Sequence, residues 1–463
     1  MPSLVKSLVL GLAAASAVHA QASFIQTCTS RLLDGRLDPI VNPGRVSYHS
    51  HVVSGGNDFN FSTTYEDALN SPCSSCAIKE DPSIYWAPKL YFHAANGSFI
   101  SVPLEGDDSV GNMGGMLVRY SFNSGPSKDK IEPFPEGFRM LAGNPFKRVN
   151  TRDFTSAAVG HTCLGPNEEH YSGFPPVKCP GGIRTEVTFP NCWNGAADVP
   201  DHQSHVSYPV NGTYLNGPCP AGYEHRLPTV AMAIIYRTDV FNGEWDEVNG
   251  QPFVLAPGDP TGYGMHGDFI NGWNIPALQD TISACTTPGA DCPPSTLTRY
   301  TPGEQQMCKI PYQVDEQVTG VLDRLPGCNP LTTDFLAGIM NMKQCALKTK
   351  IDISVGARGP VGGWPYIGCA SDWVSQGKLL KDDQFDSPAM TPRRCIEYCQ
   401  VKGYTYAGLE MGRECYCGNT IPTGRGPKTG IYGNCNMPCT GDNSLKCGGN
   451  QALQLYQRPS LGR

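Results

Sequence analysis

The sequence predicts a mainly β protein, with a large β-sandwich or jelly-roll-like N-terminal domain followed by a small, disulfide-rich α+β module. Three observations predict this fold class. Short segments alternate apolar or β-branched residues with polar ones, glycine and proline are abundant at 52 and 40 of 463 residues, and 20 cysteines fall into two groups. A chain of this length can bury one large core, whereas the smaller part needs disulfides to compensate for few buried contacts.

Strands are expected where the alternating segments are bounded by Gly, Pro, Asn or Asp. These segments are 46–53, 84–92, 99–103, 116–122, 184–189, 205–210 and 229–236. A helical pattern occurs in three segments, 275–284, 335–347 and 391–402, and the first and third carry a proline suited to a first helical turn. We expect the strands of the large domain to pack in layers around one core.

Cysteine positions divide the chain in two. Twelve cysteines lie in 28–345 and eight in 369–447, so each part can close its own disulfides, although the pairing cannot be read from the sequence. Cys73 and Cys76 have the spacing of a redox or zinc pair. In a cysteine-rich secreted chain, however, that spacing predicts structural disulfides.

Glycine and proline mark the expected boundary between the two parts. The segment 356–363 has the composition of a flexible linker, so we assign 21–355 to the N-terminal domain and 364–463 to the C-terminal module. Residues 1–20 show the basic start, the short apolar run and the small residues before the cleavage point that are typical of a secretory signal peptide.

Several features predict a protein that is secreted and located outside the cell or in its wall. Cysteines in this number fit an oxidising route. The tail after Tyr456 has no apolar stretch for a membrane span or a lipid-anchor signal. A net charge of -7 without a long basic run argues against nucleic acid and anionic membranes as partners, and we expect a monomer. The expected N-glycosylation acceptors are Asn60, Asn96 and Asn211.

The C-terminal cysteines belong to a frame of short motifs. The frame consists of Tyr366-Ile-Gly-Cys369, Cys395-Ile-Glu-Tyr-Cys399, Cys415-Tyr-Cys417-Gly418, Cys435-Asn-Met-Pro-Cys439 and Cys447-Gly-Gly. It resembles a WSC domain, the module of fungal cell-wall stress sensors and of many secreted fungal polysaccharide-active proteins. The resemblance implies a carbohydrate-binding unit, and we expect β-glucan or another cell-wall glycan as its partner.

Histidines of the N-terminal part gather in three motifs, which are Tyr48-His49-Ser-His51, Asp201-His202-Gln-Ser-His205 and His266-Gly-Asp268. On a predicted strand His49 and His51, two residues apart, point to the same face. Imidazoles and carboxylates in one pocket can perform acid/base chemistry or hold a divalent metal. The candidate catalytic residues are therefore His49, His51, Asp201, His202, His205, His266 and Asp268.

These motifs also have structural interpretations. The rings can be satisfied by backbone groups, an aspartate before a histidine can cap a turn, and His-Gly-Asp can form a tight loop. The two interpretations differ in whether the motifs converge. We expect four rings to line one pocket: His49, His51, His205 and His266. We also expect Asp201 or Asp268 to be hydrogen-bonded to one of them.

The order of motifs along the large domain resembles a known family. The order is Asp38-Pro-Ile-Val-Asn-Pro-Gly44, His49-Ser-His51, Tyr85-Trp86-Ala-Pro-Lys89-Leu-Tyr91, Asn191-Cys-Trp193, Asp201-His202-Gln-Ser-His205 and His266-Gly-Asp268. Over about 38–273 this resembles a fungal secreted family catalogued as a domain of unknown function, which often precedes WSC modules. The resemblance implies no established reaction.

Aromatic side chains supply a second argument for carbohydrate. Sugar rings stack on Trp and Tyr, and charged or amide groups bind their hydroxyls, although aromatic residues in strands mostly belong to the core. The candidate substrate-binding residues are Trp86, Lys89, Tyr91, Tyr208, Trp273, Trp373 and Tyr404.

Two functional classes follow. The first is a secreted enzyme that cleaves polysaccharide as a hydrolase or a lyase through a histidine-rich pocket. No cofactor is identifiable from the sequence, apart from a divalent metal that the histidine cluster could hold. The second is a non-catalytic wall-binding or effector-like protein. No Gly-x-Ser-x-Gly motif is present, which disfavours an esterase of the common hydrolase fold.

Overall fold

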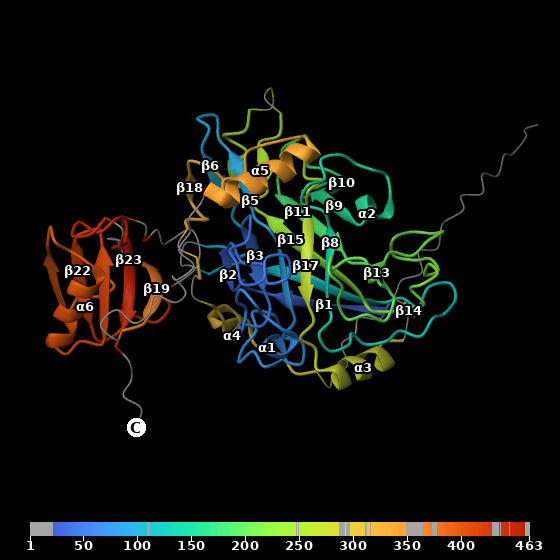
Figure 1. Cartoon of the computed structure of the whole chain (residues 1–463), viewed down its shortest axis with the longest axis horizontal. Coiled ribbons are helices and arrows are strands. Elements are labelled where there is room, and N and C mark those ends of the chain that lie inside the picture. Colours follow the sequence, from blue (N-terminus) through green and yellow to red (C-terminus); the bar gives the residue numbers. More distant parts are fainter. Residues whose placement is uncertain are drawn as a thin grey trace, which may run out of the picture.

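The computed structural model describes residues 22–108, 112–246, 248, 250–286, 292, 297–310, 313–314, 316–348, 364–372, 377–427, 435, 437–443 and 445–458. The expected signal peptide and linker lie outside these residues, as does Trp373. The described chain is built mainly from antiparallel sheets, so the predicted fold class is confirmed (Figure 1).

Two large sheets form a sandwich in the N-terminal part. Their strand orders are β1-β7-β15-β11-β9-β10 and β2-β3-β4-β17-β8, and neighbouring strands are antiparallel. The six-stranded sheet consists of β1 (Ala22–Cys28), β7 (Met116–Phe122), β15 (Thr229–Tyr236), β11 (Ile183–Thr188), β9 (Val159–Cys163) and β10 (Glu169–Tyr171). The five-stranded sheet consists of β2 (Leu33–Gly35), β3 (His51–Ser54), β4 (Ile84–Pro88), β17 (His266–Ile270) and β8 (Arg139–Gly143).

The main core lies between these two sheets. Alternate residues of β7 and β15, such as Val118 and Met232, face the inner residues of the second sheet, such as Phe269 of β17. The two layers approach closely at Gly267, where a Cβ atom would lie 1.9 Å from the terminal methyl of Met232 and 3.1 Å from the Phe189 ring. A larger residue at this position would force the Met232 side chain to move.

The outer face of the five-stranded sheet carries a second apolar core. Val53, Trp86 and Ile270 lie on this face, which is covered by the segment after β2, with Leu37, and by the segment after β3, with Phe59. Strand β4 is consequently buried on both faces, which explains its uninterrupted apolar sequence. Polar side chains on the same face, such as His51 and Asp268, are therefore enclosed between the strands and the covering segments.

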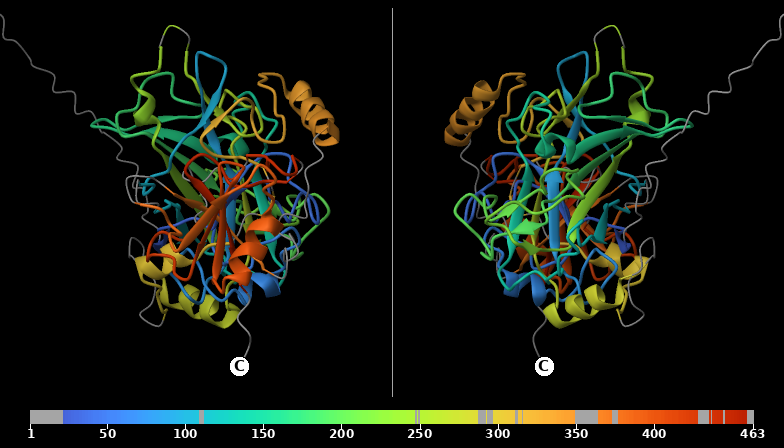
Figure 2. Two further views of the ribbon diagram at one scale, coloured as in Figure 1. Left: turned by 90° about the vertical axis from the view of Figure 1, so that its left-hand side faces the viewer. Right: turned by 90° about the vertical axis from the view of Figure 1, so that its right-hand side faces the viewer.

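Smaller elements complete the N-terminal part. Two further sheets have the orders β16-β5-β6-β18 and β13-β12-β14. Their strands are β16 (Phe253–Leu255), β5 (Leu90–His93), β6 (Phe99–Ser101), β18 (Val321–Leu322), β13 (Val206–Ser207), β12 (Cys192–Trp193) and β14 (His225–Arg226). The helices are α1 (Tyr65–Leu69), α2 (Phe154–Ala157), the 3-10 helix η1 (Thr238–Phe241), α3 (Ile275–Ala284), α4 (Pro302–Met307) and α5 (Phe335–Lys348). Helices α3 and α4 lie at one end of the sandwich and α5 at the other (Figures 1 and 2).

The C-terminal part has its own sheet and its own core. The strand order is β19-β23-β21-β22-β20. The elements are β19 (Tyr366–Ser371), β20 (Asp383–Asp386), α6 (Pro392–Val401), β21 (Tyr406–Glu410), β22 (Glu414–Gly418) and β23 (Ala452–Gln457). Helix α6 begins with Thr391 as its N-cap and buries Ile396 against the sheet, in a core that also holds Trp364 and Tyr456.

Disulfides form separately in the two parts. In the described N-terminal residues Cys28 bonds Cys76, Cys73 bonds Cys308, Cys163 bonds Cys179, Cys192 bonds Cys219, and Cys285 bonds Cys292. In the C-terminal part the pairs are Cys369–Cys435, Cys395–Cys415, Cys399–Cys417 and Cys439–Cys447. Cys73 and Cys76 are thus structural cysteines and not a redox or zinc pair, since each forms a disulfide with a different partner.

Most predicted elements occur where the pattern was strongest. The segments 116–122, 229–236 and 275–284 coincide with β7, β15 and α3. The predicted strand 84–92 is divided at Lys89 into β4 and β5. Three strand predictions were too long: β3 begins only at His51, β6 ends at Ser101, and the segment 205–210 contains only the two residues of β13. His49 therefore precedes β3, so the same-face argument does not apply to it.

A buried histidine of the sandwich predicts a loss of stability in acid. His161 of β9 is fully buried, with Nδ1 2.9 Å from the Thr185 hydroxyl and Nε2 3.0 Å from the Gly262 carbonyl. Burial lowers the pKa of His161 from 6.5 to about 4. Between these values the unfolded chain binds a proton that the folded chain does not, so stability is lost as pH falls through this window, by at most about 3 kcal/mol.

We therefore expect His161→Gln to flatten the dependence of the unfolding free energy on pH between about 7 and 4. Guanidinium denaturation at several pH values, with the disulfides intact, measures this slope for both proteins. Parallel curves for the variant and the wild type would contradict the prediction.

Candidate functional site

Strand register places three of the predicted residues on one face of the five-stranded sheet. His266 and Asp268 alternate along β17, and Asp268 lies opposite Trp86 of the neighbouring strand β4. His51, the first residue of β3, lies opposite Pro88, two residues farther along β4. Because side chains on paired positions share a face, all three point toward the segment that covers the sheet.

The rings of His49, His51 and His266 form a compact cluster. One nitrogen of each ring lies within 4.8 Å of the others, and Nε2 of His49 is 3.0 Å from Nε2 of His266. The ring centroids of His49 and His51 are 4.4 Å apart. His51 is fully enclosed, whereas His49 and His266 keep 5% and 6% of their surface exposed. The cluster is therefore almost completely enclosed by protein.

Backbone carbonyls fix two of the three rings. Nδ1 of His51 lies 3.0 Å from the Leu37 carbonyl oxygen, and Nδ1 of His266 lies 2.9 Å from that of Gly264. A carbonyl only accepts, so both rings carry their proton on Nδ1 and have a lone pair on Nε2. Burial, together with the neighbouring rings, lowers the pKa of His49 and His51, and burial lowers the pKa of His266 to about 4. The cluster is thus held as neutral imidazoles at neutral pH.

Two buried carboxyl groups accompany the rings. Burial and the nearby carboxyl of Asp38 raise the pKa of Asp268 well above its usual value. Burial also raises the pKa of Asp38 to about 6, against the opposing effect of the Ile40 and Val41 amides that donate to its carboxylate. Sequence reasoning did not select Asp38 as a site residue, since nothing in its local spacing shows that the covering segment brings it to Asp268.

Several buried polar atoms of this region have no hydrogen-bond partner among the described residues. They are Nδ1 of His49, Nε2 of His51, Nε1 of Trp86 and Oδ2 of Asp268. Buried polar groups are nearly always paired, and further unpaired atoms occur elsewhere in the described residues, for example at Gln26 and Arg226. Those beside the three rings are free to bind a ligand or a reacting group.

The second histidine motif lies along the edge strand of the sheet, where His202 interacts electrostatically with the buried Asp38 and His205 lies farther from the cluster. The loop that contains it bonds to β8 through the amides of Arg139 and Leu141, and Nε2 of His205 lies 2.9 Å from the Arg139 carbonyl oxygen. Arg139 pairs with Ile270, four residues along β17 from His266, a separation of about 13 Å at ~3.3 Å per residue. His205 therefore does not join the other three rings, contrary to the prediction of four rings in one pocket.

The aspartates of the motifs also differ from expectation. Asp201 accepts hydrogen bonds from the amides of Gln203 and Ser204 and so acts as a turn cap. His202 is bonded instead through Nδ1 to Asp198, at 2.7 Å. Among the described residues neither Asp201 nor Asp268 bonds an imidazole. The sequence did carry a signal for this Asp198–His202 pair, because the two residues are separated by three others in the pattern Asp-x3-His.

Most of the predicted sugar-binding side chains of the large domain are buried. Trp86, Tyr91 and Trp273 are fully enclosed in the core, and the Tyr91 hydroxyl donates to the Val318 carbonyl, with an oxygen–oxygen distance of 2.9 Å. Lys89 lies inside the protein with its Nζ 2.9 Å from Oδ2 of Asp34. A ring buried on both faces cannot stack on a sugar, so these positions build the domain and are not a binding platform.

The other predicted residues occupy partly exposed positions. The hydroxyl of Tyr208 donates to the Thr188 carbonyl, and that of Tyr404, in the C-terminal part, donates to the Asp382 carbonyl. Trp373 lies outside the described residues. Of the expected glycosylation acceptors, Asn96 and Asn211 are exposed and Asn60 is half-buried.

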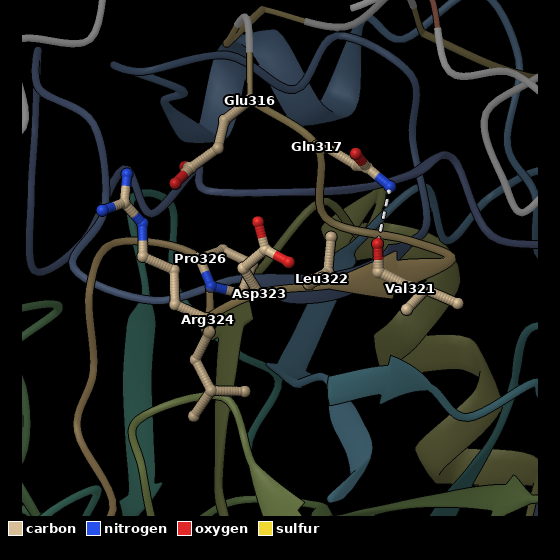
Figure 3. A pocket seen from close by; sticks show the side chains of 8 residues that line it. Glu316, Gln317, Val321, Leu322, Asp323, Arg324 and Pro326 are labelled. Carbon is tan, nitrogen blue, oxygen red and sulfur yellow. Dashed lines mark hydrogen bonds between the residues drawn. The ribbon is translucent and has the colours of Figure 1, made fainter. Parts of the chain in front are cut away.

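A surface pocket of about 450 Å³ lies near the segment that carries His49. It is lined by Glu316, Gln317, Val321, Leu322, Asp323, Arg324, Leu325 and Pro326, and Figure 3 shows the Glu316 and Arg324 side chains at its rim. Glu316 forms an ion pair with Arg36, which in turn donates to the Ser47 carbonyl. Through these bonds the pocket wall supports the backbone that leads into the histidine cluster.

The C-terminal part contains a charged group, with buried carboxylates and a partly exposed lysine, that sequence reasoning missed. Lys378 pairs with Glu410, lies 3.2 Å from Asp372, and stands over the ring of Tyr416 at 4.4 Å. Burial raises the pKa of Glu410 to about 7, although Lys378 opposes this shift. The sequence carries no local signal for the group, because Asp372, Lys378 and Glu410 lie on different elements.

Comparison with known proteins identifies both parts. Residues 38–273, which are 236 of the 463 residues, match the family described as "Domain of unknown function (DUF1996)". The chain belongs to this family. Residues 366–449 match the WSC domain, so the predicted order of the two is confirmed. The family match spans all three histidine motifs.

Three relatives match this chain over part of its length. A WSC domain-containing protein of Arthroderma benhamiae is 30% identical over 35% of this chain and 18% of its own length. The xylosyltransferase oxt of Drosophila melanogaster is 33% identical over 20% of this chain and 10% of its own length, and Kremen protein 2 of Mus musculus is 33% identical over 20% of each. The chain thus spans a fifth or less of the length of these relatives.

The WSC domain implies carbohydrate binding in general and a role at the cell wall. The disulfide-rich structure is consistent with an extracellular or wall location. None of the helices in the described part of the chain has the length and hydrophobicity that a membrane-spanning helix needs.

Proposed function

We propose that the chain is a wall-associated protein that acts on polysaccharide, in which the WSC module binds β-glucan or another wall glycan and the N-terminal domain, 21–355, performs the chemistry. The observation that carries the proposal is the convergence of His49, His51 and His266 beside Asp268 on one sheet face. These residues come from segments far apart in the sequence. Local structure alone does not require such a meeting.

The arrangement fits cleavage by proton transfer. A lyase step needs a base that removes a proton from the sugar and an acid that protonates the departing oxygen. Nε2 of His51 and Nδ1 of His49 have no bonding partner among the described residues, and Asp268 adds a carboxyl group to the same face. A hydrolase would use the same groups to activate water and to protonate the leaving oxygen.

The burial of His51 favours a second candidate function. A fully enclosed ring cannot touch a polymer without movement of the covering segment. In this alternative the cluster only stabilises the sandwich, and the chain is a non-catalytic wall-binding or effector-like protein. Product formation separates the two candidates.

The test uses the full chain and a chain that ends at Val355, each incubated with soluble and insoluble fungal and plant wall polysaccharides. Reducing ends and unsaturated products report cleavage, and co-sedimentation reports binding. The proposal expects products from at least one polysaccharide. Co-sedimentation of the full chain without products from any polysaccharide would favour the non-catalytic alternative.

Truncation at Val355 should affect insoluble and soluble substrates differently. Loss of the module removes the increase in local concentration at an insoluble surface, so retention and cleavage there should fall by about 10-fold or more. Cleavage of soluble substrate should change little, because the histidine cluster lies in the remaining part. An equal loss on both substrates would contradict the division of roles.

A further inference from the structure

The histidine cluster has features that proton transfer does not require. We propose that His49, His51 and His266 form a binding site for one divalent transition-metal ion, for which Zn²⁺ is the best match. Three neutral imidazoles are ligands that Zn²⁺ and its neighbours in the first transition row prefer, whereas Ca²⁺ and Mg²⁺ prefer oxygen. The proposal concerns binding alone and stands apart from the proposed action on polysaccharide.

The orientation of the rings supports metal binding. Metal-ligating histidines usually donate their second ring nitrogen to a carbonyl or a carboxylate, which fixes the ring and its tautomer. His51 and His266 do so through the Leu37 and Gly264 carbonyls, at 3.0 Å and 2.9 Å. Their Nε2 atoms are consequently lone-pair donors within the cluster.

The unpartnered nitrogens provide an independent argument. If Nε2 of His266 accepts the hydrogen bond in its contact with Nε2 of His49, then Nε2 of His49 carries the proton of that ring. Nδ1 of His49 then has a lone pair and is an acceptor, like Nε2 of His51. Nδ1 of His49 and Nε2 of His51 then both lack a donor among the described residues. A cation can occupy the Nε2 lone pairs of His51 and His266, and that of His49 once the His49 proton has moved from Nε2 to Nδ1.

The distances between the ring nitrogens agree with this assignment. Ligand nitrogens around tetrahedral Zn²⁺ lie about 3.3 Å apart for Zn–N distances of ~2.0–2.1 Å. The three nitrogens here are separated by 3.0 Å in one pair and by no more than 4.8 Å in all pairs, so small ring movements suffice. Asp268 lies two residues from His266 on the same face of β17, so an oxygen-bearing side chain is close to the three rings. Three protein ligands leave a fourth position for water or substrate.

The second compact group of potential ligands does not compete. Cys395, Cys399 and Cys415 lie close together, but all three are disulfide-bonded and have no thiolate to offer. Within the described residues the histidine cluster is therefore the better metal site.

The experiment uses the untagged full chain, treated with chelator, dialysed, and titrated with Zn²⁺ and separately with Co²⁺. Calorimetry and elemental analysis should give one ion per chain, and Co²⁺ should show the intense visible absorption of a nitrogen-ligated tetrahedral ion. His51→Asn and His266→Asn keep a side-chain N–H for the Leu37 and Gly264 carbonyls and remove the ligand nitrogen. Each should weaken Zn²⁺ binding by at least about 100-fold.

His161→Gln is the matched control, because His161 is equally buried and lies outside the cluster. It should bind Zn²⁺ like the wild type. Absence of stoichiometric binding by the wild type, or unchanged affinity in both asparagine variants, would overturn the proposal. If the asparagine variants do not fold, the Co²⁺ spectrum of the wild type decides alone. No readout involves substrate, so this outcome is independent of the polysaccharide assay.

Discussion

Replacing His266 by asparagine is expected to slow polysaccharide cleavage by about 10²- to 10⁴-fold, the usual contribution of a positioned acid or base. The amide of asparagine can still donate to the Gly264 carbonyl, which now accepts from Nδ1 of His266. The group that approaches His49 is lost. The measurement is the initial rate on the polysaccharide that the wild type cleaves fastest, with the melting temperature recorded in parallel.

His161→Gln serves as the control, since it also removes a buried imidazole of the sandwich but lies outside the cluster. Its rate should remain within about two-fold of the wild type, because a group outside the reacting cluster contributes little to the transition state. A His266→Asn variant that is stable and fully active would exclude the cluster from catalysis. A variant that cleaves slowly only because it unfolds at the assay temperature would show a structural role.

The fold could be predicted where local pattern decides structure. Strands β7 and β15 have one face in the core and alternate accordingly, and helix α3 has its N-cap Asn274 and a proline in its first turn. The segment 84–92 was predicted as one strand but forms two, β4 and β5. Strand β4 is covered on both faces and shows no alternation, so periodicity could not separate core residues from a binding surface.

The candidate site depends on contacts that no local pattern encodes. His49 and His266 are 217 residues apart, and their meeting depends on the pairing of β4 with β17 and on the segment that covers the sheet. His205 has similar neighbours in sequence, yet it bonds the Arg139 carbonyl because its loop follows the edge strand β8. The same residue types thus have different surroundings, which the strand register decides.

Substitution of Lys89 by methionine is expected to destabilise the N-terminal domain by about 3–5 kcal/mol, the cost of breaking a buried ion pair. Lys89 Nζ lies 2.9 Å from Asp34, whose other oxygen lies 2.8 Å from Nε of Arg31, and Arg31 also pairs with Asp107. These two cations and two anions balance one another in the interior. Burial alone would raise the pKa of Asp34, but Arg31 and Lys89 hold it below its usual value.

The substitution would leave one excess negative charge among these buried groups. A second variant, Lys89→Met with Asp34→Asn, restores the balance with one cation and one anion, so it should recover part of the lost stability. The unfolding free energies of the wild type, both single variants and the double variant form a cycle, with expected coupling of about 0.5–3 kcal/mol. Guanidinium denaturation with intact disulfides supplies these values. Strictly additive losses would show that the buried charges do not depend on one another.

The ion pair of Lys89 and Asp34 also joins β2 to the end of β4, and these two strands flank His51. The stability lost with Lys89 should therefore be accompanied by weaker ordering of the histidine cluster.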